Sequence, residues 1–245
     1  MSKKKTGLRR PETVYGGLIP TMNNRGFMSD TMEYFAERFV EQAAACRSPI
    51  LDVGCAYGIA TRAALEAGAT VVASDMEQGH LDVLLNETPD ELRDKLTTRV
   101  GVLPGLAFPN ESFEGILCSR LLHFLLPEEL RLAMRDMHNW LRPGGRLYIV
   151  VDTPYTGFWF STATDYERRK AGGEEWPGFI ADISELLEDG QVPPGMLPYL
   201  NPMDPDILRR ECERAGLRVV EASFSGGDGR REGRQHAGVI AVRST

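Results

Sequence analysis

The sequence predicts an α/β fold: a doubly wound Rossmann-like sheet, mostly parallel, with an antiparallel C-terminal strand and a lid inserted after the fifth strand. Alternating strand and helix signals indicate the parallel part, because parallel neighbours need a crossover between them. The apolar strand signals lie near 49–53, 70–74, 98–102, 114–119 and 146–151, and the helical patterns between them near 60–67, 77–86, 90–96 and 127–141. Segments 218–224 and 236–242 follow a helix that begins at Asp204-Pro205, and they predict a closing antiparallel pair.

Composition places the chain among ordinary globular proteins. It has 245 residues, of which 42% are hydrophobic and 26% charged, enough for one α/β domain with an added cap. No run approaches the roughly 20 apolar residues of a membrane span, and the N-terminus lacks the apolar core of a signal peptide. We therefore expect a cytoplasmic protein with no membrane partner.

Charge and cysteine usage exclude two further classes. The net charge is −7, and the first ten residues hold five Lys and Arg and no acid, so the rest of the chain is still more acidic. An acidic body repels nucleic acid, and we expect no nucleic-acid partner; the basic start is either a solvated tail or a contact arm. The four cysteines are scattered without a Cys-x-x-Cys pair, which argues against a disulfide frame and a metal site.

The stretch from Ile50 to Gly58 carries the first functional signal. A short apolar strand contains Asp52 and meets Gly54 and Gly58, with Cys55 and Ala56 between them, just before a helix begins. The helix N-terminus there has a partial positive charge, and the glycine backbone lets a ligand approach closely. An acid before the first glycine repels a pyrophosphate and attracts an ammonium group, directly or through a water.

At these residues the sequence resembles the class I S-adenosylmethionine-dependent methyltransferases of the type 11 kind, whose first motif is an acid, any residue, Gly, three residues and Gly. Further matches are Asp75 at the end of the next strand, the turn at 106–114, and Leu-x-Pro-Gly-Gly at 141–145. The resemblance implies S-adenosylmethionine as the cofactor and methyl transfer by in-line displacement, but it does not identify the acceptor. An acidic chain and an aromatic segment near 152–203 favour a small-molecule acceptor, and we expect methylation at its oxygen or nitrogen.

The resemblance also implies a set of cofactor-binding residues. Asp75 would accept hydrogen bonds from the two ribose hydroxyls. The family commonly has an aspartate for the adenine amino group where this chain has Val102, so adenine would be held by backbone groups and apolar contacts. The expected cofactor-binding residues are Asp52, Gly54, Cys55, Ala56, Gly58, Asp75, Met76, Leu103 and Ser119.

Two segments outside the alternating core are expected to cover the site. Residues 1–28 form a tail and a cofactor-covering segment, with Tyr15, Arg25 and Phe27 as candidate lining or as plain packing residues. The methyltransferase domain then spans 29–245, beginning with a helix that Ser29-Asp30 caps and that runs to about Ala45.

The second covering segment is the insert at about 152–203, which holds eight aromatic residues and lies at the carboxyl edge of the sheet. We interpret it as a substrate lid, with Phe158, Trp159 and Phe160 on the acceptor side. The alternative is a small satellite core or the contact surface of a homodimer.

His123, directly after the fourth strand, is the first candidate for a catalytic base, because an unperturbed histidine has a pKa of about 6.5. The alternative is that it braces this loop. Tyr155 is a weaker catalytic candidate at the tip of the fifth strand, as is Asp152. Two rival functions stay open: a cofactor-binding or partner-binding protein without catalysis, and a short-chain oxidoreductase suggested by Tyr166-x-x-x-Lys170.

Overall fold

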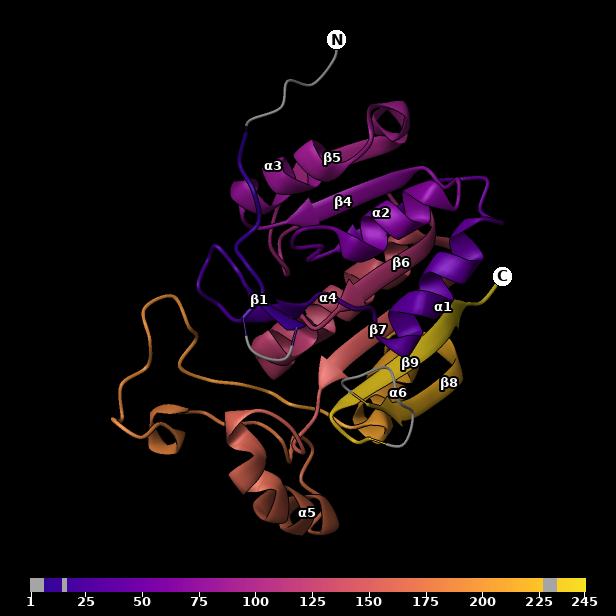
Figure 1. Cartoon of the computed structure of the whole chain (residues 1–245). Helices are drawn as coiled ribbons and strands as arrows, with labels where there is room; N and C mark the ends of the chain where they lie inside the picture. Colours follow the sequence, from indigo (N-terminus) through magenta and orange to yellow (C-terminus); the bar gives the residue numbers. More distant parts are fainter. Residues whose placement is uncertain (1–6, 15–16, 227–232) are drawn as a thin grey trace.

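A seven-stranded twisted sheet forms the centre of the molecule (Figure 1). The computed structural model describes residues 7–14, 17–226 and 233–245. The strand order is β5-β4-β3-β6-β7-β9-β8, and β9 runs antiparallel to both of its neighbours while the other pairs are parallel. The predicted fold class is confirmed. The strands are β3 (Ile50–Val53), β4 (Val71–Asp75), β5 (Leu96–Val100), β6 (Phe113–Ser119), β7 (Leu141–Asp152), β8 (Leu217–Ser225) and β9 (His236–Arg243).

Helices cover both faces of this sheet because the strands are apolar on both sides. The pleat sends Leu147, Ile149 and Val151 of β7 into one apolar cluster and Tyr148 and Val150 into the other. The first cluster is closed by α4 (Pro127–Trp140) and α6 (Pro205–Arg214), and the second by α1 (Tyr34–Ala43), α2 (Ile59–Glu66) and α3 (Gln78–Glu87). No helix in the described part of the chain is long and apolar enough to cross a membrane.

Two local expectations were wrong. Helix α1 begins at Tyr34 with Glu33 at its N-cap, and not after Ser29-Asp30. The reason is a hairpin of β1 (Leu18–Pro20) and β2 (Phe27–Ser29), which keeps the chain extended until Ser29. The helix expected near 90–96 is a 3-10 helix, η2 (Asp90–Lys95), and β5 follows it directly at Leu96.

The insert between β7 and α6 projects beyond the end of β7, as the orange segment of Figure 1 shows. It contains η4 (Phe158–Thr162), α5 (Ala163–Ala171) and η5 (Ser184–Leu186). Trp159 is 7% exposed and packs with Ile183 and Leu200 in an apolar cluster separate from the two that flank the sheet. Its indole N–H donates to the carbonyl of Thr153 at 2.8 Å, so both parts of this side chain are used in packing.

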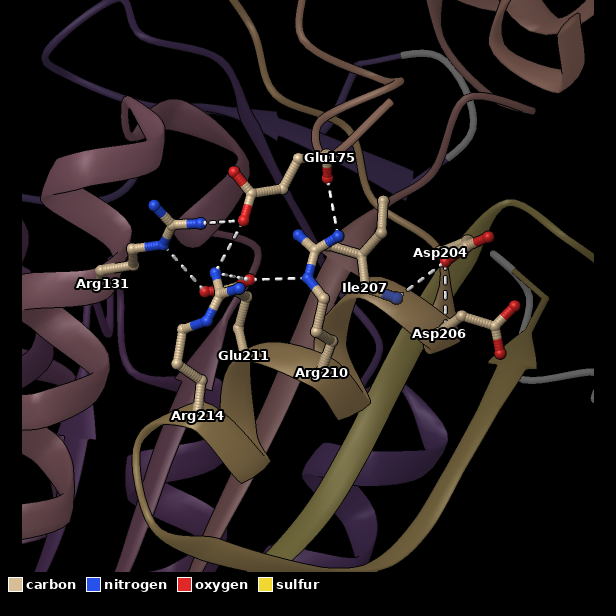
Figure 2. A network of polar contacts seen from close by, with 8 residues as sticks. All are labelled: Arg131, Glu175, Asp204, Asp206, Ile207, Arg210, Glu211 and Arg214. Carbon is tan, nitrogen blue, oxygen red and sulfur yellow. Dashed lines mark hydrogen bonds and ion pairs between the residues drawn. The ribbon is translucent and has the colours of Figure 1, made fainter. Parts of the chain in front are cut away.

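An ionic cluster ties the middle of the insert to α4 and α6 (Figure 2). Glu175 of the insert pairs with Arg131 at 2.6 Å and with Arg214 at 3.0 Å. The buried carboxylate of Glu211 accepts from the same two arginines and from Arg210. The indole of the neighbouring Trp176 contacts two of these guanidinium groups, Arg131 at 5.4 Å and Arg210 at 5.0 Å from its ring centroid. The insert is therefore anchored to the body at a second point, away from Trp159.

The burial of Trp159 predicts a difference between two adjacent aromatics. Trp159→Ala should lower the free energy of unfolding by about 3 kcal/mol, because it leaves a cavity in the satellite cluster. Phe160→Ala should change it by less than about 0.5 kcal/mol, because Phe160 is 60% exposed. Urea unfolding of both variants measures the difference. Equal losses, or an unaltered Trp159→Ala variant, would contradict the satellite core.

Candidate functional site

A cavity of about 420 Å³ opens at the carboxyl ends of β3, β4 and β6. Its floor includes Asp52, Asp75 and Ser119, which stand in or at the ends of these three strands. Its cover comes from residues 21–33, which we call the strap, and from Leu197 and Tyr199 of the insert. The volume lies within the range of small-molecule and cofactor sites, and parallel α/β sheets bind their ligands at this edge.

The turn after β3 is built from backbone conformations that favour glycine. Gly54 and Gly58 have φ of +71° and +74°, and a Cβ at Gly54 would lie 2.3 Å from Leu121 Cδ1. Ala56 also has a positive φ, +45°, which costs an alanine roughly 1–2 kcal/mol. Gly54, Cys55 and Ala56 line the cavity, whereas Gly58 supports the turn from behind by donating its N–H to the carbonyl of Cys55 at 2.8 Å.

Asp52 is a buried carboxylate at the cavity floor. The hydroxyl of Thr61 donates to Oδ2 of Asp52 at 2.6 Å, which links the strand to the first turn of α2. Burial raises the pKa of Asp52 to about 6, although the hydrogen bond from Thr61 opposes the shift. At neutral pH the group is therefore still mainly ionised, and it supplies negative charge beneath the glycine turn.

Asp75 organises the neighbouring wall of the cavity. Its Oδ2 accepts from the N–H of Ala56 at 2.8 Å, and its Oδ1 accepts from the N–H of Glu77 at 2.9 Å. His80 Nδ1 lies 2.9 Å from the same Oδ1, and His80 Nε2 accepts from the N–H of Met22 at 3.0 Å. Because Nε2 of His80 accepts a hydrogen bond, Nδ1 carries the ring proton and donates a hydrogen bond to Asp75. Sequence reasoning missed His80, which couples the strap to Asp75.

An apolar wall continues from Asp75 across the loop after β5. Met76, Val102 and Leu103 all line the cavity, so the site has no aspartate where the resemblance leads one to expect it. Arg25 and Phe27 of the strap also line the cavity, which is the first of the two alternatives that the sequence left open for them. Tyr15 lies outside the described residues.

The structure does not bring the proposed catalytic residues to the cavity wall. His123 is 2% exposed and its Nδ1 accepts from the N–H of Asp152 at 3.3 Å. Burial lowers the pKa of His123 to about 4, although Asp152 opposes the shift. Tyr155 bonds through its hydroxyl to Glu167, and the Arg234 guanidinium lies 3.6 Å from its ring centroid. Burial raises the pKa of Tyr155 to about 12.

The aromatic triplet of the insert is also placed elsewhere. Phe158, Trp159 and Phe160 are not among the lining residues, because Trp159 turns into the satellite cluster and the other two side chains face solvent. The lining residues from the insert are Leu197 and Tyr199, which a search for aromatic density near the end of the fifth predicted strand could not single out.

The pair behind the oxidoreductase alternative is structural. Tyr166 is a buried core residue, and the ammonium of Lys170 bonds to Asp204 and, at 2.7 Å, to Asp206. Neither side chain lines the cavity.

A charged cluster lies at the β6–β7 end of the cavity, and sequence reasoning singled out Asp152 in it but missed Arg120, His236 and Glu33. Arg120, whose φ is +53°, pairs through Nε and Nη2 with both oxygens of Asp152, at 3.0 and 3.3 Å. Oδ1 of Asp152 also lies 2.9 Å from His236 Nδ1, and His236 Nε2 lies 3.3 Å from Glu33 Oε1. Although burial opposes ionisation, Arg120, His123 and His236 hold the pKa of Asp152 well below its usual range. Arg120 and Glu33 line the cavity.

Comparison with known proteins agrees with this geometry. A methyltransferase domain model matches residues 51–149. The cypemycin N-terminal methyltransferase of a Streptomyces species is 35% identical over 107 residues, which are 43% of this chain and 42% of that protein. The probable methyltransferase ltbC of Aspergillus luteorubrus is 29% identical over 144 residues, 50% of this chain and 49% of the relative. The chain thus spans about half the length of these two relatives.

Solved structures share the fold over most of the chain. The glycopeptide N-methyltransferase MtfA, complexed with sinefungin, has a TM-score of 0.60 at 18% identity and covers 89% of each chain. An S-adenosylmethionine-dependent methyltransferase from Mesorhizobium loti has a TM-score of 0.55 at 20% identity, covering 80% of this chain and 90% of its own. Residues 51–149 thus match a methyltransferase domain, and the glycine turn and the strand order agree with the resemblance to the class I S-adenosylmethionine-dependent methyltransferase superfamily.

Proposed function

We propose that this methyltransferase acts on a small organic acceptor and methylates it at nitrogen or oxygen. The observation that carries the proposal is the continuity of the cavity. One space extends from Asp75 and Met76 at β4, past the glycine turn, to Glu33 and Arg120 at the β6–β7 end. Such a space has room for a cofactor at one end and an acceptor at the other.

The residues present fit S-adenosylmethionine. The Asp75 carboxylate would accept from a ribose hydroxyl, because an ionised carboxylate has about four acceptor positions and three are used within the protein, which leaves about one. The acidic floor at Asp52 suits the ammonium of the methionine part. Met76, Val102 and Leu103 offer apolar surface to the adenine, and Cys55 and Ser119 complete the lining nearby.

When bound, the cofactor supplies a sulfonium methyl group whose displacement leaves a neutral thioether, so the chain needs no acid on that side. The chain's own task is to exclude water and to hold the acceptor nucleophile in line. Positioning of this kind can contribute on the order of 7–11 kcal/mol. The strap and Tyr199, which cover the cavity, support that role.

The acceptor end of the cavity favours an organic molecule of modest size. Met32, Phe124 and Leu197 are among the apolar residues that line the cavity, and the chain as a whole is acidic. One of the similar proteins is named a glycopeptide N-methyltransferase, and another is named the cypemycin N-terminal methyltransferase. This supports nitrogen as well as oxygen among the acceptor atoms.

The proposal is tested by S-adenosylhomocysteine release from S-adenosylmethionine in the presence of a panel of amines, phenols, alcohols, carboxylic acids and thiols. Turnover with amines or hydroxyl compounds is the expected result. Protein and RNA fractions are assayed beside the panel, and turnover confined to those fractions would overturn the small-acceptor proposal.

Asp75→Ala should weaken S-adenosylhomocysteine binding by about 1.5–3 kcal/mol, the cost of losing hydrogen bonds to a charged group. Asp82→Ala is the matched control, because Asp82 lies on α3 and accepts from Gln78 without lining the cavity. Titration calorimetry on folded variants measures both affinities. An unchanged Asp75→Ala affinity would remove Asp75 from the cofactor site.

His123→Asn should keep most of the turnover, and its pH–rate profile should superimpose on that of the wild type. With a pKa of about 4, His123 stays neutral over the neutral pH range and gains no charge that a rate could follow. His138→Asn on α4 is the control for a histidine away from the site. A fall of about 10²–10⁴-fold, confined to His123→Asn, would restore His123 as the base.

A further inference from the structure

Glu33 is a buried acid with one carboxylate oxygen that no described residue of the protein hydrogen-bonds. It is 4% exposed and lines the cavity. It stands at the N-cap of α1, yet its side chain makes no capping hydrogen bond there. Oε1 faces His236 Nε2 at 3.3 Å, while Oε2 is buried and receives no hydrogen bond from the described residues. A buried carboxylate oxygen without a donor is unfavourable, so this geometry is suited to a donor that arrives with a ligand.

Glu33 is connected to two further titratable side chains, His236 and Asp152, by consecutive polar contacts. His236 of β9 lies between Glu33 and Asp152 of β7, with its Nδ1 2.9 Å from Asp152. Arg120 binds both oxygens of Asp152 and so compensates the charge of that carboxylate. If the Nδ1–H of His236 donates to Asp152, one further proton occupies the contact between His236 Nε2 and Glu33 Oε1. Glu33 then contacts the imidazole of His236 through Oε1, and its other oxygen, Oε2, can accept a hydrogen bond from a ligand.

Electrostatics supports the same reading of the pair. Burial raises the pKa of Glu33 above its usual value, although His236 and Arg120 oppose the shift and Asp152 and Glu37 add to it. These four groups come from β9, the turn after β6, β7 and α1, the elements that surround Glu33. A carboxylate of raised pKa is a stronger base than an ordinary one, as general bases in enzymes often are.

We propose that Glu33 is the acceptor-binding base of this methyltransferase, and that its Oε2 accepts the N–H or O–H proton of an amine or hydroxyl acceptor. This inference rests on the proposed function. The nucleophile forms a bond to the methyl carbon, and the carbon–sulfur bond breaks with its electron pair going to sulfur. The proton released from the acceptor passes to Oε2, and the Glu33–His236 pair then holds one proton more than before.

The site should therefore discriminate between acceptors by charge. An amine or a hydroxyl brings the donor that Oε2 lacks. A carboxylate acceptor brings a second negative oxygen to a buried carboxylate, and the nearby guanidinium of Arg120 is already engaged by Asp152. We expect the substrate class to be amines and hydroxyl compounds and to exclude carboxylic acids.

The first test needs no known acceptor. The full chain is saturated with S-adenosylhomocysteine, and the ring signals of His236 are followed by nuclear magnetic resonance during titration with methylammonium or with acetate, probes small enough to enter any acceptor space. Methylammonium should shift the His236 signals saturably in the wild type and in Glu37→Gln, whereas acetate should leave them unchanged. Glu37 is the matched control, because it is an exposed acid one turn along the same helix that does not line the cavity.

Glu33→Gln keeps the size of the side chain and removes its charge, and it should abolish the methylammonium response. No response in the wild type, or an equal response in Glu33→Gln, overturns the role of Glu33. Failure of S-adenosylhomocysteine to bind counts against the proposed function instead, so the two failures are distinguishable.

The second test uses the acceptor that gives turnover in the panel. Glu33→Gln should lower kcat by about 10²–10⁴-fold with S-adenosylhomocysteine affinity within about twofold of wild type. Glu33→Asp, which keeps the carboxylate, should recover part of the loss, and Glu37→Gln should match the wild type. A Glu33→Gln enzyme with wild-type kcat, or one in which cofactor affinity falls in parallel with kcat, overturns the proposal.

Discussion

The site depends on two hydrogen bonds that join the turn after β3 to the strand beside it. The N–H groups of Gly54 and Cys55 both donate to the carbonyl of Ser74, at 2.7 and 3.0 Å. This contact continues the parallel register of Val53 with Ser74, so the turn cannot move without unpairing β3 from β4. It also brings the N–H of Ala56 within 2.8 Å of the Asp75 carboxylate. A backbone pairing, and not a side-chain contact, thus sets the distance between the glycine turn and Asp75, the acid proposed to bind the ribose.

The positions of residues at the ends of the parallel strands could be predicted from the sequence, because short runs of neighbouring residues mark where each strand ends. Ile50 to Gly58 shows a strand, a turn and a helix start in nine consecutive positions, and the acid at Asp75 follows from the end of the next apolar run. In both cases the function depends on where a parallel strand ends, and that edge is visible in the sequence. The cavity lining by Met76 and Leu103 follows for the same reason, because both residues come just after strands.

The acceptor end could not be predicted, because its geometry is made by contacts between distant parts of the chain. Glu33 and His236 belong to α1 and β9, and no spacing in the sequence relates them. His123 has the residue type and position of a base, yet the packing of η3 (Leu122–Phe124) turns it away from the cavity. The prediction for Trp159 failed for a related reason. A segment rich in aromatic residues indicates that some of them are buried, but it does not indicate which residues they pack against.

The position of β9 has a consequence for how the enzyme is assembled. This strand inserts between β7 and β8, pairing with β7 from Asp152↔His236 to Arg146↔Val242, and it is the last strand along the chain. The strands β3, β4 and β6 at the floor of the cavity precede it in the chain. His236 reaches Asp152 and Glu33 only when β9 pairs with β7. In a newly made chain, the contact between Glu33 and His236 can therefore form only after β9 has been synthesised, although Glu33 itself comes before every strand of this sheet.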